Sequence, residues 1–162
     1  MSDRQHPAGE QGSGSKSGRR KKQNPRRQAR TLALQVLYET DQTQHPWLEV
    51  LDRTIESNES NPESASYARQ LVEGIFQHQR SIDREIGLAA PAFPIEQLSP
   101  VDRNALRIAI FELRYTDVPV KVAINEAVEL AKRFGGESSG RFVNGVLGTV
   151  VDRLPDSDRK RR

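Results

Sequence analysis

Residues 105–113 place the strongest constraint on how this chain folds. They read Ala-Leu-Arg-Ile-Ala-Ile-Phe-Glu-Leu, which puts apolar side chains on almost every side of a helix. A helix of this kind is stable when other elements surround it. Ser99, Pro100 and Asp102 mark its start, because serine caps a helix, proline fits its first turn and a carboxylate suits its positive end. We therefore expect a helical bundle with this segment at its centre.

Apolar residues recur at helical spacing on both sides of the central segment. Further helices are predicted from Pro25, from Pro46 to about Ser57, from Pro62 with a kink, after Pro119, and from about Ser138 to Leu154. Arg26, Arg27 and Arg30 are predicted to lie on the polar flank of the first of these helices. The sequence contains no strand pair with a hairpin turn and no internal repeat, so the predicted fold class is all-α. No apolar run approaches the roughly 20 residues of a membrane-spanning helix, which argues against a transmembrane protein.

Charge divides the chain into a basic extension and an acidic body. Residues 1–30 contain nine Lys or Arg against two acidic residues, whereas residues 31–154 carry a net charge of −6. Residues 1–25 lack the apolar side chains that would offset the entropy of ordering, so we interpret them as disordered. The expected organisation is this extension, a folded domain over 26–154 and a charged tail over 155–162. Such an extension either binds a polyanion, such as nucleic acid, or only keeps the protein soluble.

The sequence offers no constellation typical of an enzyme. It lacks a phosphate-binding loop, a dinucleotide fingerprint, and the HExxH and GxSxG motifs. It contains no Cys, and its three His residues lack the spacing of a metal site. The absence of Cys and of an apolar leader fits a cytoplasmic protein. We expect no catalytic residue, no metal and no cofactor.

A more informative group of residues flanks the turn at Gly135. Proteins bind single-stranded RNA through cations on its phosphates, aromatic rings stacked on its bases and amides at base edges. The residues of these types near the turn are Lys132, Arg133, Phe134, Arg141, Phe142 and Asn144. Each ring also suits the core at a helix end. We favour RNA contact for Phe142 and the core for Phe134, which continues the apolar stripe of its helix.

Four other positions are less specific. Gly145 and Gly148 interrupt the last predicted helix, and they indicate either close helix packing or the approach of RNA. Tyr38 has a ring that packs and a hydroxyl that suits either an interface or the rim of the core. Asp102 has a structural role wherever a carboxylate occupies the third position of a helix.

Longer stretches of the sequence resemble a known family. Residues 117–132 read Asp-Val-Pro-Val-Lys-Val-Ala-Ile-Asn-Glu-Ala-Val-Glu-Leu-Ala-Lys, and residues 142–147 read Phe-Val-Asn-Gly-Val-Leu. Together with residues 26–38 and 106–113, these stretches resemble the bacterial NusB family of transcription antitermination factors. The resemblance extends over most of the predicted folded domain, in the family's order.

The resemblance implies a fold, a function and a set of partners. NusB-like proteins form about seven helices in two subdomains, so the helix from Pro62 is expected to divide near residues 79–81. They bind boxA RNA of ribosomal RNA leader transcripts together with NusE, a small-subunit ribosomal protein, in a complex that keeps RNA polymerase from terminating. The expected RNA-binding residues are Arg26, Arg27, Arg30, Lys132, Arg133, Phe134, Phe142 and Asn144. The resemblance further places Tyr38 and Asp102 at the NusE-binding surface.

Two other interpretations stay open on the sequence alone. NusB-like domains also form the RNA-binding front end of certain ribosomal RNA cytosine methyltransferases, but those continue into a large catalytic domain, whereas this sequence stops at Arg162. The second is a non-catalytic helical adaptor whose basic extension only provides solubility. The sequence does not distinguish a monomer from a homodimer.

The composition of the extension leads to a prediction. Deleting residues 1–25 should leave the melting temperature almost unchanged, because the segment has little apolar surface to bury. The same deletion should weaken binding to random RNA, because it removes positive charge. Thermal melts and filter binding measure the two effects. A fall of many degrees in the melting temperature would show that the extension packs on the body.

Overall fold

A computed structural model describes residues 24–159 as a helical bundle. Its elements are α1 (Pro25–Thr43), α2 (Trp47–Ser57), α3 (Pro62–Gln77), α4 (Gln79–Ala89), a 3-10 turn η1 (Ile95–Gln97), α5 (Pro100–Tyr115), α6 (Val120–Phe134), α7 (Ser139–Asp152) and the single turn α8 (Asp156–Arg159). These residues include no strand, and the all-α fold class is confirmed. Residues 1–23 and 160–162, which include most of the predicted extension and the end of the predicted tail, lie outside the described part of the chain.

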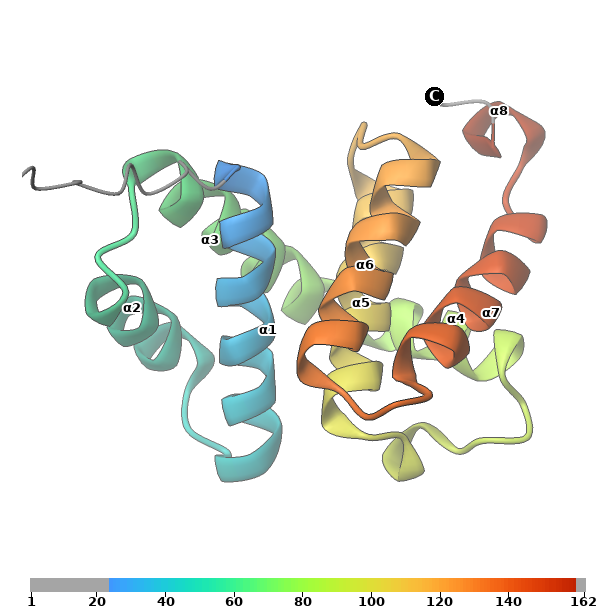
Figure 1. Ribbon diagram of the computed structural model, residues 1–162, viewed down its shortest axis with the longest axis horizontal. Helices are drawn as coiled ribbons and strands as arrows, with labels where there is room; N and C mark the ends of the chain where they lie inside the picture. Colours follow the sequence, from blue (N-terminus) through green and yellow to red (C-terminus); the bar gives the residue numbers. More distant parts are fainter. Residues whose placement is uncertain (1–23, 160–162) are drawn as a thin grey trace, which may run out of the picture.

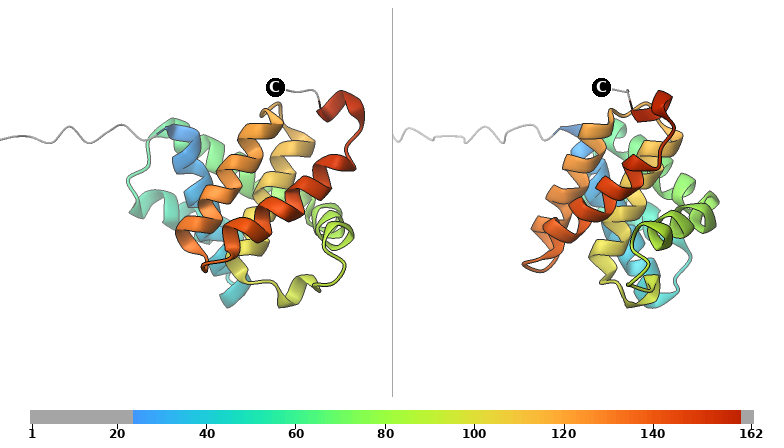
Figure 2. Two further views of the ribbon diagram at one scale, coloured as in Figure 1. Left: turned by 45° about the vertical axis from the view of Figure 1, so that its right-hand side comes forward. Right: turned by 90° about the vertical axis from the view of Figure 1, so that its right-hand side faces the viewer.

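The helices form two groups that share α5 (Figure 1). Helices α1, α2 and α3 pack together on one side, and α4, α6 and α7 lie on the other. Helix α5 contacts α1 and α3 in the first group and α4, α6 and α7 in the second. Helix α7 runs obliquely from the end of α6 past α4 and contacts both (Figure 2). The expected division of the third helix falls at His78, between α3 and α4.

Polar caps explain where the helices begin. The side chain of Asn24 accepts a hydrogen bond from the backbone N–H of Arg26 (3.0 Å), and Pro25 occupies the first turn of α1. Asn24 and Pro25 therefore belong to the start of α1 rather than to the extension, so a deletion that tests the extension without removing this cap has to stop at residue 23. Ser99 caps α5 as predicted, since its hydroxyl accepts from the backbone N–H of Asp102 (3.2 Å).

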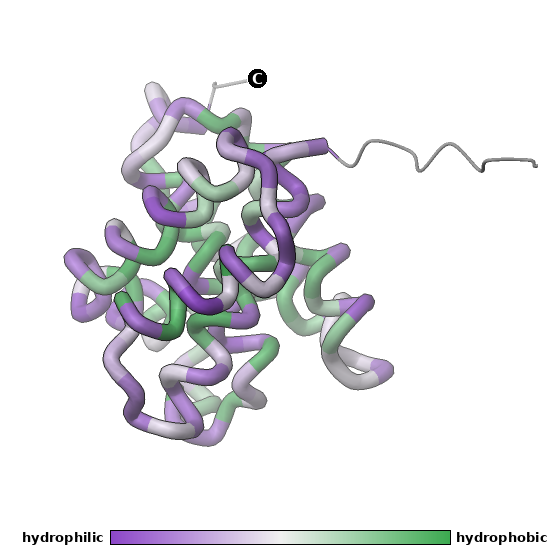
Figure 3. The backbone as a smooth tube through the Cα atoms, turned by 90° about the vertical axis from the view of Figure 1, so that its left-hand side faces the viewer, coloured by the Kyte–Doolittle hydropathy of each residue, from purple (hydrophilic) through white to green (hydrophobic). Residues whose placement is uncertain are grey.

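The core is centred on α5, whose residues 104–113 are all buried. This confirms the central position predicted for the apolar segment. Hydrophobic residues are concentrated where the helices face one another, and hydrophilic ones follow the outer turns (Figure 3). Helix α3 crosses α5 at Gly74, where a Cβ atom would lie 2.2 Å from Cε2 of Phe111. With Phe111 in this position, the crossing therefore leaves no room for a Cβ atom at residue 74.

A buried ion pair joins α1 to α5. Glu112 has no solvent exposure, and Arg30 is 3% exposed. The Nε and Nη2 atoms of Arg30 donate to the Glu112 carboxylate at 2.9 and 2.8 Å, and the hydroxyl of Tyr67 on α3 donates to the same group. Burial raises the pKa of Tyr67, and the negative charge of Glu112 raises it further. The prediction that Arg30 lies on the polar flank of α1 is wrong, because a carboxylate distant in the sequence draws it into the interior.

A second polar cluster connects the other end of α1 to α5. Asp41 accepts hydrogen bonds from Arg103 (2.9 Å), Asn104 (2.8 Å) and Arg107 (3.3 Å). The Nε and Nη2 atoms of Arg107 also donate to Asp83 of α4, at 2.8 and 3.0 Å. A single guanidinium on α5 thereby links the first and second groups of helices.

The buried pair leads to a prediction about stability. Arg30→Met should lower the free energy of unfolding by about 3 to 5 kcal/mol, because it leaves the Glu112 carboxylate buried without a cation. Arg53→Met is the matched control, since the Arg53 side chain is 60% exposed and pairs with Glu39 at the surface. That control should cost less than about 1 kcal/mol. Urea denaturation measures both, and equal losses would contradict the assignment.

Candidate nucleic-acid interface

The first turn of α1 presents two arginines to solvent. Because α1 begins at Pro25, Arg26 and Arg27 occupy adjacent exposed positions in that turn. The guanidinium of Arg26 lies over the ring of Tyr67, 4.9 Å from its centroid. The hydroxyl of Tyr67 is fixed in turn by Glu112. A ring orders the arginine without neutralising it, so Arg26 keeps its positive charge at the surface.

Arg27 is bound by a carboxylate of the second group of helices. Its Nη2 and Nε atoms donate to the two oxygens of Glu126 on α6, at 2.9 and 3.2 Å. The Glu126 side chain is 16% exposed, and one of its oxygens lies 3.9 Å from Nη1 of Arg30. The hydrogen bond and the charge of Glu126 raise the pKa of Arg27. Glu126 has no signal in the sequence that points to this role, because no spacing rule connects partners that lie 99 positions apart.

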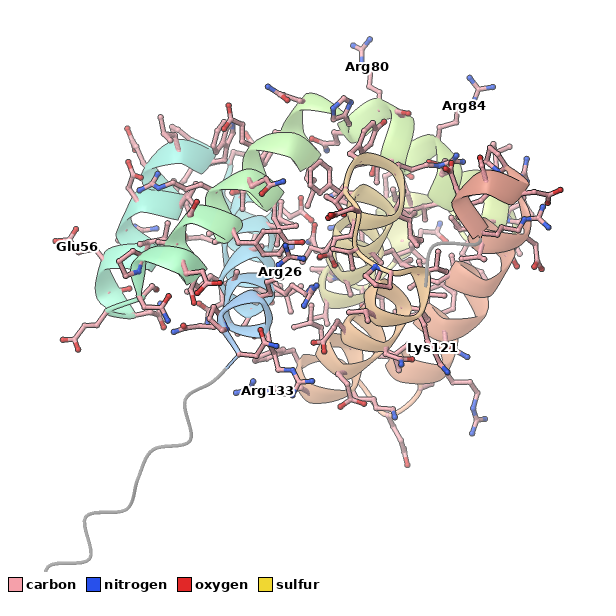
Figure 4. All side chains as sticks on the ribbon, turned by 90° about the horizontal axis from the view of Figure 1, so that it is seen from above. Arg26, Glu56, Arg80, Arg84, Lys121 and Arg133 are labelled. Carbon is pink, nitrogen blue, oxygen red and sulfur yellow. The ribbon has the colours of Figure 1, made fainter. Side chains whose placement is uncertain are left out.

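A hollow of about 400 Å³ opens beside this pair, between α1 and α6, and we name it the α1–α6 groove. Its lining residues are Arg27, Thr31, Glu126, Glu129, Leu130, Lys132 and Arg133. In Figure 4, Arg133 lies beside the point where the chain enters α1, whereas Arg80 and Arg84 project from the opposite edge. The groove thus gathers cations from the start of α1 and the end of α6 on one side of the molecule.

The turn after α6 is tight and requires glycine. A Cβ atom at Gly135 would lie 2.6 Å from the carbonyl oxygen of Ala131 and 2.5 Å from Oγ of Ser139. The backbone N–H of Gly136 donates to the same hydroxyl at 3.0 Å. Helix α7 therefore returns directly alongside α6, and its first turn lies next to the cations that end α6.

Of the two rings near this turn, one is not placed as expected. Phe134 is 39% exposed, and the guanidinium of Arg133 lies over its ring, 4.9 Å from the centroid. Phe142 is half-buried, packs against the core and contacts Phe93 edge to face at 5.6 Å. The prediction that Phe134 belongs to the core is wrong, because Phe134 ends α6 and the periodicity of that helix stops there. The solvent-facing ring is that of Phe134.

The exposed side of α7 carries an amide and two glycines. Asn144, Gly145 and Gly148 are all exposed. A Cβ atom at Gly145 or Gly148 would meet no described atom within 4 Å. Close helix packing therefore does not explain these glycines within residues 24–159, and the surface around them is open.

Tyr38 and Asp102 lie apart from the cationic residues. Tyr38 is 45% exposed and precedes Asp41 by one turn, near the start of α5. The Oδ1 atom of Asp102 is shielded from solvent and accepts no hydrogen bond from the described residues. Arg27, at the opposite end of α1, lines the α1–α6 groove. The structure thus gathers Arg27, Lys132 and Arg133 at one surface and places the predicted NusE-binding residues elsewhere.

Residues 24–159 contain neither a candidate metal site nor a candidate membrane span. No group of three or more acidic or His side chains is arranged to hold a metal ion in that part of the chain. None of its helices has the length and apolar character needed to cross a membrane.

The fold and this surface define a class of protein: an all-α bundle of two helical groups with cations gathered in a groove between them. The model of the NusB family matches residues 27–152. The chain belongs to the NusB family, whose members are transcription antitermination proteins rather than enzymes.

Individual relatives agree with this assignment. The transcription antitermination protein NusB of Dehalococcoides mccartyi is 49% identical over 137 residues, which cover 84% of this chain and 96% of that protein. A structure of T. maritima NusB superposes with a TM-score of 0.77 at 32% identity, covering 83% of this chain and 96% of that one. A structure of the antitermination factors NusB and NusE in complex with double-stranded RNA gives a TM-score of 0.75 at 30% identity, over 80% of this chain and 98% of the matched one.

The placement of the two rings leads to a stability prediction. Phe142→Ala should lower the free energy of unfolding by about 2 kcal/mol, somewhat less than the 3 to 5 kcal/mol of a fully buried Phe, because its ring packs against the core. Phe134→Ala should cost about 1 kcal/mol or less, because much of that ring faces solvent. Denaturant melts of both variants give the comparison. A larger loss for Phe134→Ala would contradict the observed placement.

Proposed function

We propose that this chain is a cytoplasmic transcription antitermination factor that binds boxA-type RNA of ribosomal RNA leader transcripts. It acts together with NusE, in a complex with RNA polymerase that supports processive transcription of ribosomal RNA operons. The observation that carries the proposal is the α1–α6 groove, where Arg27, Lys132 and Arg133 line one surface. A related NusB that has been solved with NusE and double-stranded RNA supports it.

The residues of this surface divide the work of binding RNA. Arg26 and Arg27 bind phosphates at the start of α1, and Lys132 and Arg133 extend the cationic surface along α6. Arg133 over the exposed Phe134 ring offers a flat surface on which a base stacks.

Two of the predicted RNA contacts on α7 and α1 have different parts in the proposal. Asn144 on α7 supplies an exposed amide for a base edge. Phe142, half-buried, supports that turn of α7 from below. Arg30 acts as a positioning residue, because its guanidinium is bound to Glu112 beneath the surface.

Surfaces away from the groove are available to NusE. We assign Tyr38 and Asp102 to that contact, because Tyr38 exposes its ring and Asp102 is partly exposed near the start of α5. The competing identity as the front end of a ribosomal RNA methyltransferase is less well supported, because a relative matched over 96% of its own length is an antitermination protein.

Arginine substitutions test the proposal. Changing both Arg26 and Arg27 to Ala should weaken binding to all RNA sequences and flatten the slope of log K against log salt by up to about 1.4, at roughly 0.7 per single-strand phosphate contact. The control changes Arg53 and Arg69 to Ala, since both are exposed and lie on α2 and α3. That control should leave the slope unchanged.

The same titrations, run on boxA-like RNA with and without NusE of the same organism, test the partner. Affinity for boxA RNA should rise when NusE is present. A helical adaptor without RNA function would bind neither random RNA nor boxA-like RNA in these experiments. That result would overturn the proposal.

A further inference from the structure

The pairing of Arg27 with Glu126 bears on how strongly the groove binds RNA. We propose that Glu126 sets the RNA affinity of this surface: its carboxylate holds Arg27 in the free protein, and an RNA phosphate has to displace it. This inference rests on the proposed function, since it concerns the same cationic surface. It assigns to Glu126 the part of a positioning residue that also competes with the ligand.

The competition follows from the geometry of the guanidinium. Glu126 accepts hydrogen bonds from Nη2 and Nε of Arg27 at 2.9 and 3.2 Å. These two nitrogens form one edge of the planar fork, and a phosphate binds arginine through such an edge in the same two-bond manner. A phosphate that binds this edge therefore excludes the carboxylate. The groove contains this edge, since Arg27 and Glu126 both line it.

The neighbouring arginine provides an internal comparison. Arg26 lies over the Tyr67 ring, which carries no charge, so this contact leaves the positive charge of Arg26 uncompensated. Arg26 is thus ordered and available to an anion, whereas Arg27 is ordered and neutralised. The free-energy cost of binding an RNA phosphate is consequently higher at Arg27 than at Arg26, although the two residues are adjacent and of the same type.

Displacement leaves Glu126 with a second cation nearby. Nη1 of Arg30 lies 3.9 Å from one Glu126 oxygen, and Arg30 keeps its hydrogen bonds to Glu112 in either state. After displacement, the Glu126 carboxylate therefore still has the positive charge of Arg30 close to it. Its charge still lies in the groove, together with that of Glu129, and it repels the phosphate that has taken its place. The net effect of Glu126 is to lower RNA affinity.

The substitution Glu126→Gln tests whether Glu126 lowers or raises RNA affinity. Glutamine keeps the size and one acceptor oxygen of the side chain but removes the charge, so Arg27 stays positioned and is easier to capture. Affinity for a short single-stranded RNA should rise about two- to five-fold, the range expected for one partly exposed ion pair. In an Arg27→Ala background the same substitution should give no such gain. A free energy of unfolding close to that of the wild-type chain, measured in urea, shows that the variants are folded.

Glu129→Gln is the matched control. It removes the same charge from the same groove, but the Glu129 side chain is 64% exposed, lies 3.7 Å from Nζ of the similarly exposed Lys132 and acts on Arg27 only through space. Its effect on affinity should be smaller than that of Glu126→Gln. Equal gains for both variants, or weaker binding by Glu126→Gln, would overturn the inference.

A second measurement reads the pair directly in the wild-type chain. The Nε–Hε NMR signal of Arg27 should shift on RNA addition, and Glu126→Gln should change it in the free protein. An Arg27 signal that RNA leaves unaltered, while RNA is bound, would also overturn the inference. Failure of the wild-type chain to bind RNA at all would instead contradict the proposed function, so the two failures are distinguishable.

Discussion

Glu112 lies in the middle of α5 without solvent exposure, and its charge is compatible with the interior only because Arg30 and Tyr67 surround it. An uncompensated carboxylate there would cost several kcal/mol. Helices α1 and α3 therefore have to approach α5 in the one arrangement that brings both donors to the carboxylate. Arg26 and Arg27 lie one turn before Arg30 on α1, so the same buried pair determines where the surface arginines point. The stability of the core and the shape of the groove thus share one cause.

Asp41 plays the corresponding part at the other end of α1, where it receives three side chains of α5. The contact between α1 and α5 is consequently apolar along its length and polar at both ends. Polar contacts of this kind have geometric requirements that apolar packing lacks, because each donor has to face an acceptor. Arg107 extends the same requirement to α4 through Asp83. The two groups of helices are thereby held in a defined relation across the central helix.

Much of the fold was predictable because its signals are local. Proline and capping residues such as Ser99 mark helix starts, and the apolar spacing of residues 105–113 places α5 at the centre. Cations for the groove were also predictable from residue type. The pairings of Arg30 and Arg27 with glutamates 82 and 99 positions away were not, since only the tertiary fold creates them. The exposure of Phe134 was not predictable either, because this residue ends α6 and the apolar periodicity of a helix does not indicate burial beyond its last turn.

The contact between Gly74 and Phe111 has a consequence for how the family can vary. A side chain at position 74 and a large ring at position 111 compete for the same volume, since the distance between them would be 2.2 Å. Neither position can therefore change freely on its own. Among homologous sequences the two should covary, with a β-carbon at position 74 tolerated only where position 111 carries a smaller side chain. The crossing of α3 and α5 would then leave a signature in an alignment although the two residues belong to different helices.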